Sequence, residues 1–174
     1  MNFAIKKLGN GVGFDGISPD IIKILPNNMR MVITQLMTKV FKSTYPDQWK
    51  KQLLLPYPKK DHNISNPKLR GIGIGTGLSR IYDIILNTRF SYWYKPNIEQ
   101  AGFREGQGCL LHIFSIYLLL DYSVIHNLDL FIIFMDYEKA FDFVNRTLLL
   151  EKLLKNGIGE KFDNAIFNAY KSTS

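Results

Sequence analysis

The run 130–135 places six apolar residues in succession directly before an aspartate, Asp136. Four of the six are Ile or Phe, a composition that favours a strand buried on both faces. A charged side chain is costly inside such a strand, so Asp136 is expected at its end. The sequence therefore predicts a buried strand that delivers one carboxylate to the edge of a sheet.

A carboxylate at a strand end can bind a hard cation such as Mg²⁺, which takes oxygen ligands in near-octahedral geometry. A second carboxylate, Asp142, follows six residues after Asp136. The structural alternative is an acidic residue that ends the strand and caps the next helix, and for an isolated aspartate this is the commoner role. The residues that surround Asp136 shift the interpretation towards a metal ligand.

Residues 134–142 read Phe-Met-Asp-Tyr-Glu-Lys-Ala-Phe-Asp and resemble the first catalytic motif of reverse transcriptases, in the form found in LINE-type, non-LTR retrotransposon enzymes. The resemblance implies that Asp136 binds catalytic Mg²⁺, for which Mn²⁺ is an alternative. It also implies that the backbone carbonyl of Tyr137 helps to hold one of the ions.

The same resemblance implies contacts with an incoming nucleotide. Backbone N–H groups of Lys139 and Ala140 would face the triphosphate, and Phe141 would be the steric gate that lies under the sugar. Residues 68–72 are similar to a segment of the fingers in which an arginine contacts the phosphates. That similarity assigns phosphate contacts to Arg70 and its neighbour Lys68.

Three further segments match the same family in the expected order: residues 13–19, 54–60 and 98–108. They are similar to the G-P-D-G-I segment of the fingers, the I-x-P-x-x-K-K strand and the Q-x-G-F-R-x-G-R segment that precedes a long helix. Such an order is difficult to obtain by chance. The resemblance implies that basic residues of these segments contact nucleic acid, namely Lys59, Lys60 and Arg104.

By this resemblance the fold class is α+β, a right-hand polymerase fingers and partial palm. Residues 1–174 are expected to form one partial reverse transcriptase domain, with about 11–104 fingers-like and about 105–174 the start of the palm. Reverse transcriptases carry a second acidic pair on a later hairpin, and no Asp-Asp dipeptide occurs here. Two-metal catalysis needs ligands on both ions. The chain is therefore expected to be truncated before that hairpin and the thumb, and whether it is an enzyme alone stays open.

The resemblance implies that the intact protein is an RNA-directed DNA polymerase, a nucleotidyltransferase that extends a DNA primer on an RNA template with dNTPs. This chain alone is expected to be an inactive fragment. One alternative is a non-catalytic nucleic-acid-binding remnant that keeps a basic surface. Another is a decayed reading frame whose product folds poorly.

Charge is divided unevenly along the chain. Residues 1–104 carry 16 Lys and Arg against 6 acids, whereas residues 105–174 carry 6 against 9. A basic first part suits phosphate backbones and an acidic second part suits cations. An ordinary solvated surface explains the same totals equally well.

Composition also limits the compartment. Cys109 is the only cysteine, so it has no disulfide partner in the chain, and it is expected to be buried in an apolar helix. No apolar stretch approaches the roughly 20 residues of a membrane span, and the amino terminus lacks signal-peptide features. A soluble intracellular protein without membrane partners is expected, in nucleus or cytoplasm.

Apolar spacing and breakers predict the local elements. Ser18 and Pro19 favour a helix start, and Gly157 and Gly159 are expected to separate the last two helices. Trp49 is expected to pack inward. The predicted helices cover about 19–25, 28–44, 78–94, 109–125, 147–155 and 161–170, with a strand at 52–55 and a polar loop at 61–67.

Overall fold

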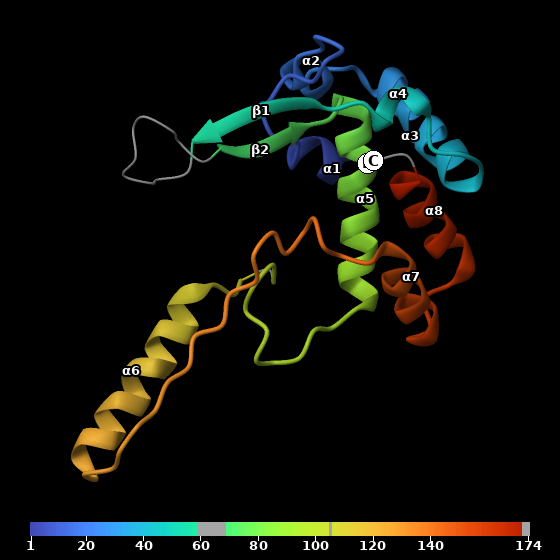
Figure 1. The fold of residues 1–174 in the computed structure, drawn as a ribbon. Coiled ribbons are helices and arrows are strands. Elements are labelled where there is room, and N and C mark those ends of the chain that lie inside the picture. The colour runs from blue at the N-terminus through green and yellow to red at the C-terminus, as the bar shows by residue number, and fades with distance from the viewer. Residues whose placement is uncertain (59–68, 105, 172–174) are drawn as a thin grey trace. The chain divides into compact units, whose positions relative to one another are not determined.

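The computed structural model describes residues 1–58, 69–104 and 106–171, and the chain divides into two compact units (Figure 1). Unit 1 comprises Met1–Trp93 and Asn145–Ser174, and unit 2 comprises Tyr94–Val144. The two units are described separately below.

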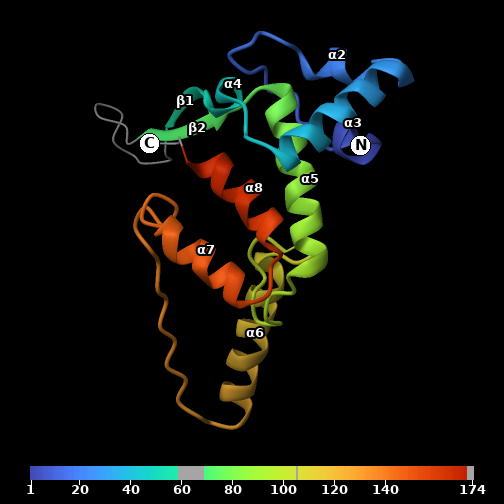
Figure 2. The same cartoon turned by 90° about the vertical axis from the view of Figure 1, so that its right-hand side faces the viewer.

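Unit 1 is mainly helical and carries one β-hairpin. Helices α7 and α8 form an antiparallel pair beside α5 (Figure 2). Helix α8 also contacts α3. The elements of unit 1 are α1 (Asn2–Lys6), α2 (Pro19–Lys23), α3 (Asn27–Lys42), α4 (Asp47–Lys50), β1 (Leu53–Pro58), β2 (Leu69–Ile74), α5 (Gly77–Trp93), α7 (Arg146–Lys155) and α8 (Glu160–Tyr170).

Local capping explains why two of these helices begin and end where they do. The Ser18 hydroxyl accepts a hydrogen bond from the Asp20 N–H at 3.3 Å, and Pro19 occupies the first position of α2, as predicted. Beyond α7, Gly157 adopts a φ of 87°, and the Ile158 N–H donates to the Leu153 carbonyl at 3.1 Å. This is a Schellman-type ending, which confirms that Gly157 separates the last two helices.

The hairpin pairs β1 with β2 in antiparallel register, from Leu53 opposite Ile74 to Pro58 opposite Leu69. The predicted strand at 52–55 is confirmed, although it begins one residue later and ends three residues later than predicted. The sequence analysis did not predict β2, because Gly71 and Gly73 weaken the strand pattern. The predicted polar loop at 61–67 lies outside the described residues.

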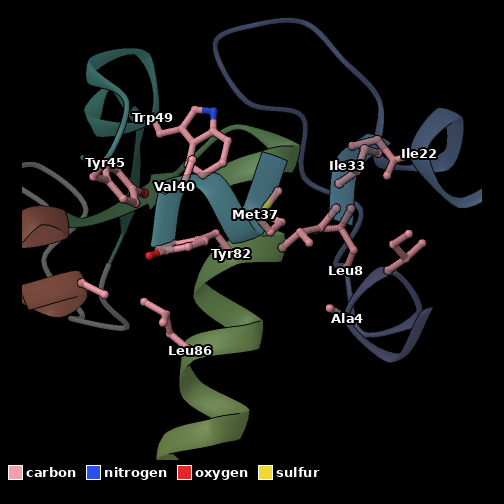
Figure 3. Packing of buried hydrophobic residues seen from close by; sticks show 13 residues of the cluster. Ala4, Leu8, Ile22, Ile33, Met37, Val40, Tyr45, Trp49, Tyr82 and Leu86 are labelled. Atoms are coloured by element: carbon pink, nitrogen blue, oxygen red, sulfur yellow. The ribbon is translucent and has the colours of Figure 1, made fainter. Parts of the chain in front are cut away.

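The core of unit 1 is a single apolar cluster that joins α1, α2, α3 and α5 with the region around α4 (Figure 3). At one end of it, the rings of Tyr45, Trp49 and Tyr82 contact one another with centroid separations of 5.6 to 5.8 Å. Trp49 is only 7% exposed, which confirms that it packs inward. Ile81 and Leu86 of α5 are also buried.

The amino-terminal segment is attached to the first turns of α5 through its backbone. The guanidinium of Arg80 donates to the carbonyl of Gly9 at 3.2 Å and to that of Gly11. Buried Gly13 lies so close to the residues that follow β2 that an added Cβ would be 2.7 Å from the Gly75 carbonyl oxygen. Only glycine fits at position 13 without displacing backbone.

Asp83 lies on α5 next to Tyr82. Its side chain is exposed at the surface, yet neighbouring protein atoms partly desolvate the carboxylate, and this desolvation raises its pKa to about 6. The Asp83 charge in turn adds to burial in raising the pKa of Tyr82 to about 12. A carboxylate with a raised pKa opposes folding once it is ionised.

Unit 2 contains α6 (Cys109–Ile125), whose bounds agree with the predicted helix at 109–125. None of its residues is buried, although α6 is apolar around most of its circumference. The prediction that Cys109 is buried is therefore wrong, since its side chain is exposed. Among the helices of the described ranges, none combines the length and the hydropathy needed to cross a membrane.

The predicted strand at 130–135 is absent. Residues 130–136 form an exposed segment without regular structure that runs back in the direction opposite to α6 (Figure 1), and Phe131 and Met135 are each 88% exposed. A strand requires a neighbour to pair its backbone groups. The two strands in the described part of the chain pair with each other, so this run joins no sheet and Asp136 does not lie at a strand end.

The close approach at Gly13 generates a prediction about stability. The substitution Gly13→Ala should lower the free energy of unfolding by about 1–3 kcal/mol, because the new methyl group overlaps backbone atoms that cannot rotate away. Gly159→Ala is the matched control, since an added Cβ there meets no atom within 4 Å. Urea titrations of both variants check this, and equal losses in the two would contradict the packing described.

The raised pKa of Asp83 generates a prediction about pH. The pKa of Asp83 in the folded chain, about 6, is higher than the pKa of an unfolded aspartate. Ionisation of Asp83 therefore destabilises the fold increasingly as pH rises from about 4 to about 6. Asp83→Asn should remove this loss. The free energy of unfolding of the variant, relative to that of the wild type, should therefore be higher at pH 7.5 than at pH 4 by about 1 kcal/mol, after allowance for solvent screening.

Thermal unfolding of the wild type and the variant across pH 4 to 7.5 measures this difference. Asp20→Asn, on the exposed surface of α2, is the control. A constant difference between wild type and Asp83→Asn at every pH would contradict the environment assigned to Asp83.

Candidate functional site

The candidate site residues fall in three groups. Arg70 belongs to β2 in unit 1, and Lys59, Lys60 and Lys68 lie outside the described residues. The others belong to unit 2: Arg104, Asp136, Tyr137, Lys139, Ala140 and Phe141.

Lys139 sets the local shape of the acidic motif. Its backbone adopts a φ of 48°, in the left-handed region that few non-glycine residues enter. Its carbonyl accepts hydrogen bonds from the N–H groups of Asp142 at 2.9 Å and Phe143 at 3.2 Å. The motif after Asp136 is thus a tight turn closed on the Lys139 carbonyl, with Ala140 and Phe141 inside its span.

Phe141 connects this turn to the second predicted motif of unit 2. Its ring meets the ring of Phe103 edge to face, with centroids 5.9 Å apart and planes at 84°. Both side chains are largely open to solvent, with Phe103 97% exposed and Phe141 78% exposed. The structure therefore brings the segments 98–108 and 134–142 together through one exposed aromatic pair.

Arg104 is directed towards the backbone of its own segment. One guanidinium nitrogen donates to the carbonyls of Asn97 at 3.4 Å and Ile98 at 3.5 Å. Both distances are long for hydrogen bonds, so the guanidinium holds the loop only weakly. Arg104 can exchange these contacts for a phosphate at small cost.

Arg70 lies directly across the hairpin from Tyr57. Both residues are exposed, and they lie one position from the Pro58–Leu69 pair that ends the ladder. A guanidinium beside an exposed aromatic ring combines a phosphate contact with a surface on which a base can stack. The described part of the hairpin thus places a cationic side chain across from an exposed aromatic one.

Asp136 is exposed, and the carbonyl of Tyr137 follows it. Within the described residues, no group of three or more His, Cys, Asp and Glu side chains is arranged to hold a metal ion. Mg²⁺ in nucleotidyl transfer is usually bound by one or two carboxylates together with phosphates and water. Asp136 and Tyr137 therefore supply only part of a ligand set, and they do not fit a complete two-ion centre.

Sequence reasoning missed the contacts made by two side chains of the site region and of α5. Phe103 was recognised as part of a motif, but its contact with Phe141 was not predicted, and two aromatics in separate motifs were the available signal. The contact of Arg89 was not predicted either: its guanidinium lies over the Phe41 ring, 5.4 Å from the ring centroid.

Comparison with known proteins gives one informative similarity, and no protein-family model matches the chain. The chain is 24% identical over 165 residues to the Retrovirus-related Pol polyprotein from type-2 retrotransposable element R2DM of Drosophila melanogaster. The match covers 94% of this chain and 15% of that polyprotein, so the chain spans about one-seventh of the relative's length. This similarity supports a retrotransposon-related origin for the chain.

Proposed function

We propose that the chain is the fingers and partial palm of an RNA-directed DNA polymerase from a LINE-type, non-LTR retrotransposon. The observation that carries the proposal is the match to a retrotransposon Pol polyprotein over 94% of the chain. A match of that extent takes in all the segments that resemble reverse transcriptase motifs. The pairing of Phe103 with Phe141 adds support, because it joins two of those segments in space.

The proposed roles are those that the resemblance to the reverse transcriptase motifs implies. Asp136 contributes one carboxylate ligand for Mg²⁺ or Mn²⁺, which when bound would neutralise charge on the nucleotide phosphates. Phe141 excludes a sugar that carries a 2′-hydroxyl. Arg70 binds phosphate, with Lys68, and the backbone N–H groups of Lys139 and Ala140 face the triphosphate.

The proposed partners are an RNA template, a DNA primer and dNTPs. Lys59, Lys60 and Arg104 contact the nucleic-acid backbone in this proposal. The described residues offer only part of a metal ligand set, so the chain alone is proposed to bind nucleic acid without synthesising DNA. A binding module that keeps the basic hairpin without any catalytic role is the second candidate, and exposed Arg70 beside Tyr57 favours it equally.

Binding to an RNA–DNA hybrid tests the part that both candidates share. Affinity should fall as salt rises, and Arg70→Gln should weaken binding and reduce the slope of log affinity against log salt by about one. Lys152→Gln, which removes an exposed charge from α7, is the control and should leave the slope unchanged. Fluorescence anisotropy at several salt concentrations provides the measurement.

Two outcomes would contradict the proposal. Affinity that does not depend on salt or on Arg70 would remove the nucleic-acid contact assigned to the hairpin. Primer extension on an RNA template by this chain, abolished by Asp136→Ala, would refute the conclusion that the chain binds without synthesis.

A further inference from the structure

Unit 1 contains a cavity of about 470 Å³ that has no part in the proposed function. It lies where residues of α4 and α5 face residues of α7 and α8, and its volume is within the range of small-molecule sites. Its lining residues come from all four helices and from the residues just before and after α4.

The walls of the cavity are largely apolar. Leu86 of α5 and Leu153 of α7 face Phe162 and Ile166 of α8 across it. Such walls favour the apolar body of a ligand, because burying each methylene group is worth about 0.8 kcal/mol. Tyr45 and Trp49 add aromatic rings, whose faces carry partial negative charge.

Helix α5 contributes two polar side chains to the cavity. Asp83 and Asn87 are one helical turn apart, and both line the cavity. The Asp83 carboxylate lies close enough to Tyr45 that its charge adds to burial in raising the pKa of that phenol. A carboxylate therefore faces the same space as an aromatic ring.

Lys50, the cationic residue that lines the cavity, does not pair with the Asp83 carboxylate. The Lys50 ammonium is 2.6 Å from Asp47 Oδ1, so its charge is already paired outside the cavity. None of the ion pairs found in the described ranges involves Asp83. The cavity thus combines a partly desolvated, uncompensated carboxylate with aromatic rings and an apolar wall.

We propose that this cavity binds a small organic cation, an ammonium group carried on an apolar or aromatic body. The ammonium donates to the Asp83 carboxylate and lies near Tyr45 and Trp49, where a cation is also attracted to the ring faces. The apolar body fills the space between Leu86 and Phe162.

Charge selects this ligand class over two others. A neutral apolar ligand would remove water from the Asp83 carboxylate and leave it without a partner, which is costly. An anion would meet the same carboxylate and be repelled, because Lys50 is held by Asp47. The proposal does not depend on nucleic-acid binding or on polymerisation.

The geometry also gives binding a pH signature. The other titratable groups that face the cavity are Tyr45, Lys50 and Tyr170, with Tyr82 and Arg89 beside Asp83 on α5. Among the described residues that line it there is no histidine and no second carboxylate. Asp83 has a pKa of about 6, so affinity for the cation should increase from pH 5 to pH 7.5.

Two probes of nearly equal shape test the proposal with the full chain. 2-Phenylethylamine carries the ammonium group, and 2-phenylethanol replaces that group with a hydroxyl. Calorimetric titration at pH 7.5 should show the amine binding about tenfold more tightly than the alcohol, because the alcohol carries no positive charge to pair with the Asp83 carboxylate. At pH 5 this preference should shrink.

Asp83→Asn should abolish the preference for the amine and leave the affinity for the alcohol unchanged. Asp20→Asn, which removes a carboxylate from α2, is the matched control and should keep the preference. A thermal unfolding curve of Asp83→Asn verifies that the variant is folded, so its loss of preference reports on binding. Equal affinity of the wild type for both probes, a preference that survives Asp83→Asn, or binding of neither probe would overturn the proposal.

Discussion

Helix α5 is the element on which unit 1 depends, because two earlier segments of the chain are attached to it. Near its start, Arg80 binds the carbonyls of Gly9 and Gly11. Further along, Tyr82 packs against Tyr45 and Trp49. Aromatic rings in contact contribute about 0.5–1.5 kcal/mol beyond the area they bury, so this group both stabilises the core and fixes the position of α4.

The dependence on α5 has a chemical consequence. The helix turns Tyr82 and Leu86 towards the core, and the intervening residue Asp83 reaches the border of the same apolar region. Its raised pKa reports a carboxylate that the fold accommodates at some cost. Titratable groups with perturbed pKa values cluster at functional sites. The position of Asp83 on α5 therefore agrees with the proposed cation site in unit 1.

Unit 2 has a different physical character. Its helix α6 and the segment 130–136 expose apolar side chains. Beyond α6, its local order includes a turn closed on Lys139 and the contact of Phe103 with Phe141. The candidate metal ligand Asp136 belongs to this unit, whereas the candidate phosphate ligand Arg70 belongs to unit 1. The proposed polymerase origin therefore rests on the order of the motifs and on the similarity to a retrotransposon Pol polyprotein.

Features that depend on a few neighbouring residues could be predicted from the sequence. The cap of α2 at Ser18, the ending of α7 at Gly157 and the bounds of α6 are of this kind. Features that depend on distant partners could not. The run 130–135 has the composition of a buried strand but pairs with no described strand, whereas β2 forms despite two glycines because β1 pairs with it.

The same distinction applies to the candidate site. Motif spacing identified Asp136 and Phe141, but it could not show that Phe103 contacts Phe141, because separate segments supply the two rings. The cavity beside Asp83 was equally inaccessible to sequence reasoning. Its walls come from α5 and from the helices α7 and α8, which are far from α5 in the chain.

Unit 1 has a packed core organised by α5, whereas residues 130–136 form no sheet. Hydrogen–deuterium exchange of the chain, followed by mass spectrometry, compares the amide protection of these two regions. The structure predicts strong protection of amides around Tyr82 in α5 and rapid exchange from 130 to 136. Protection of residues 130–136 equal to that of α5 would contradict the account and would indicate that the buried strand exists.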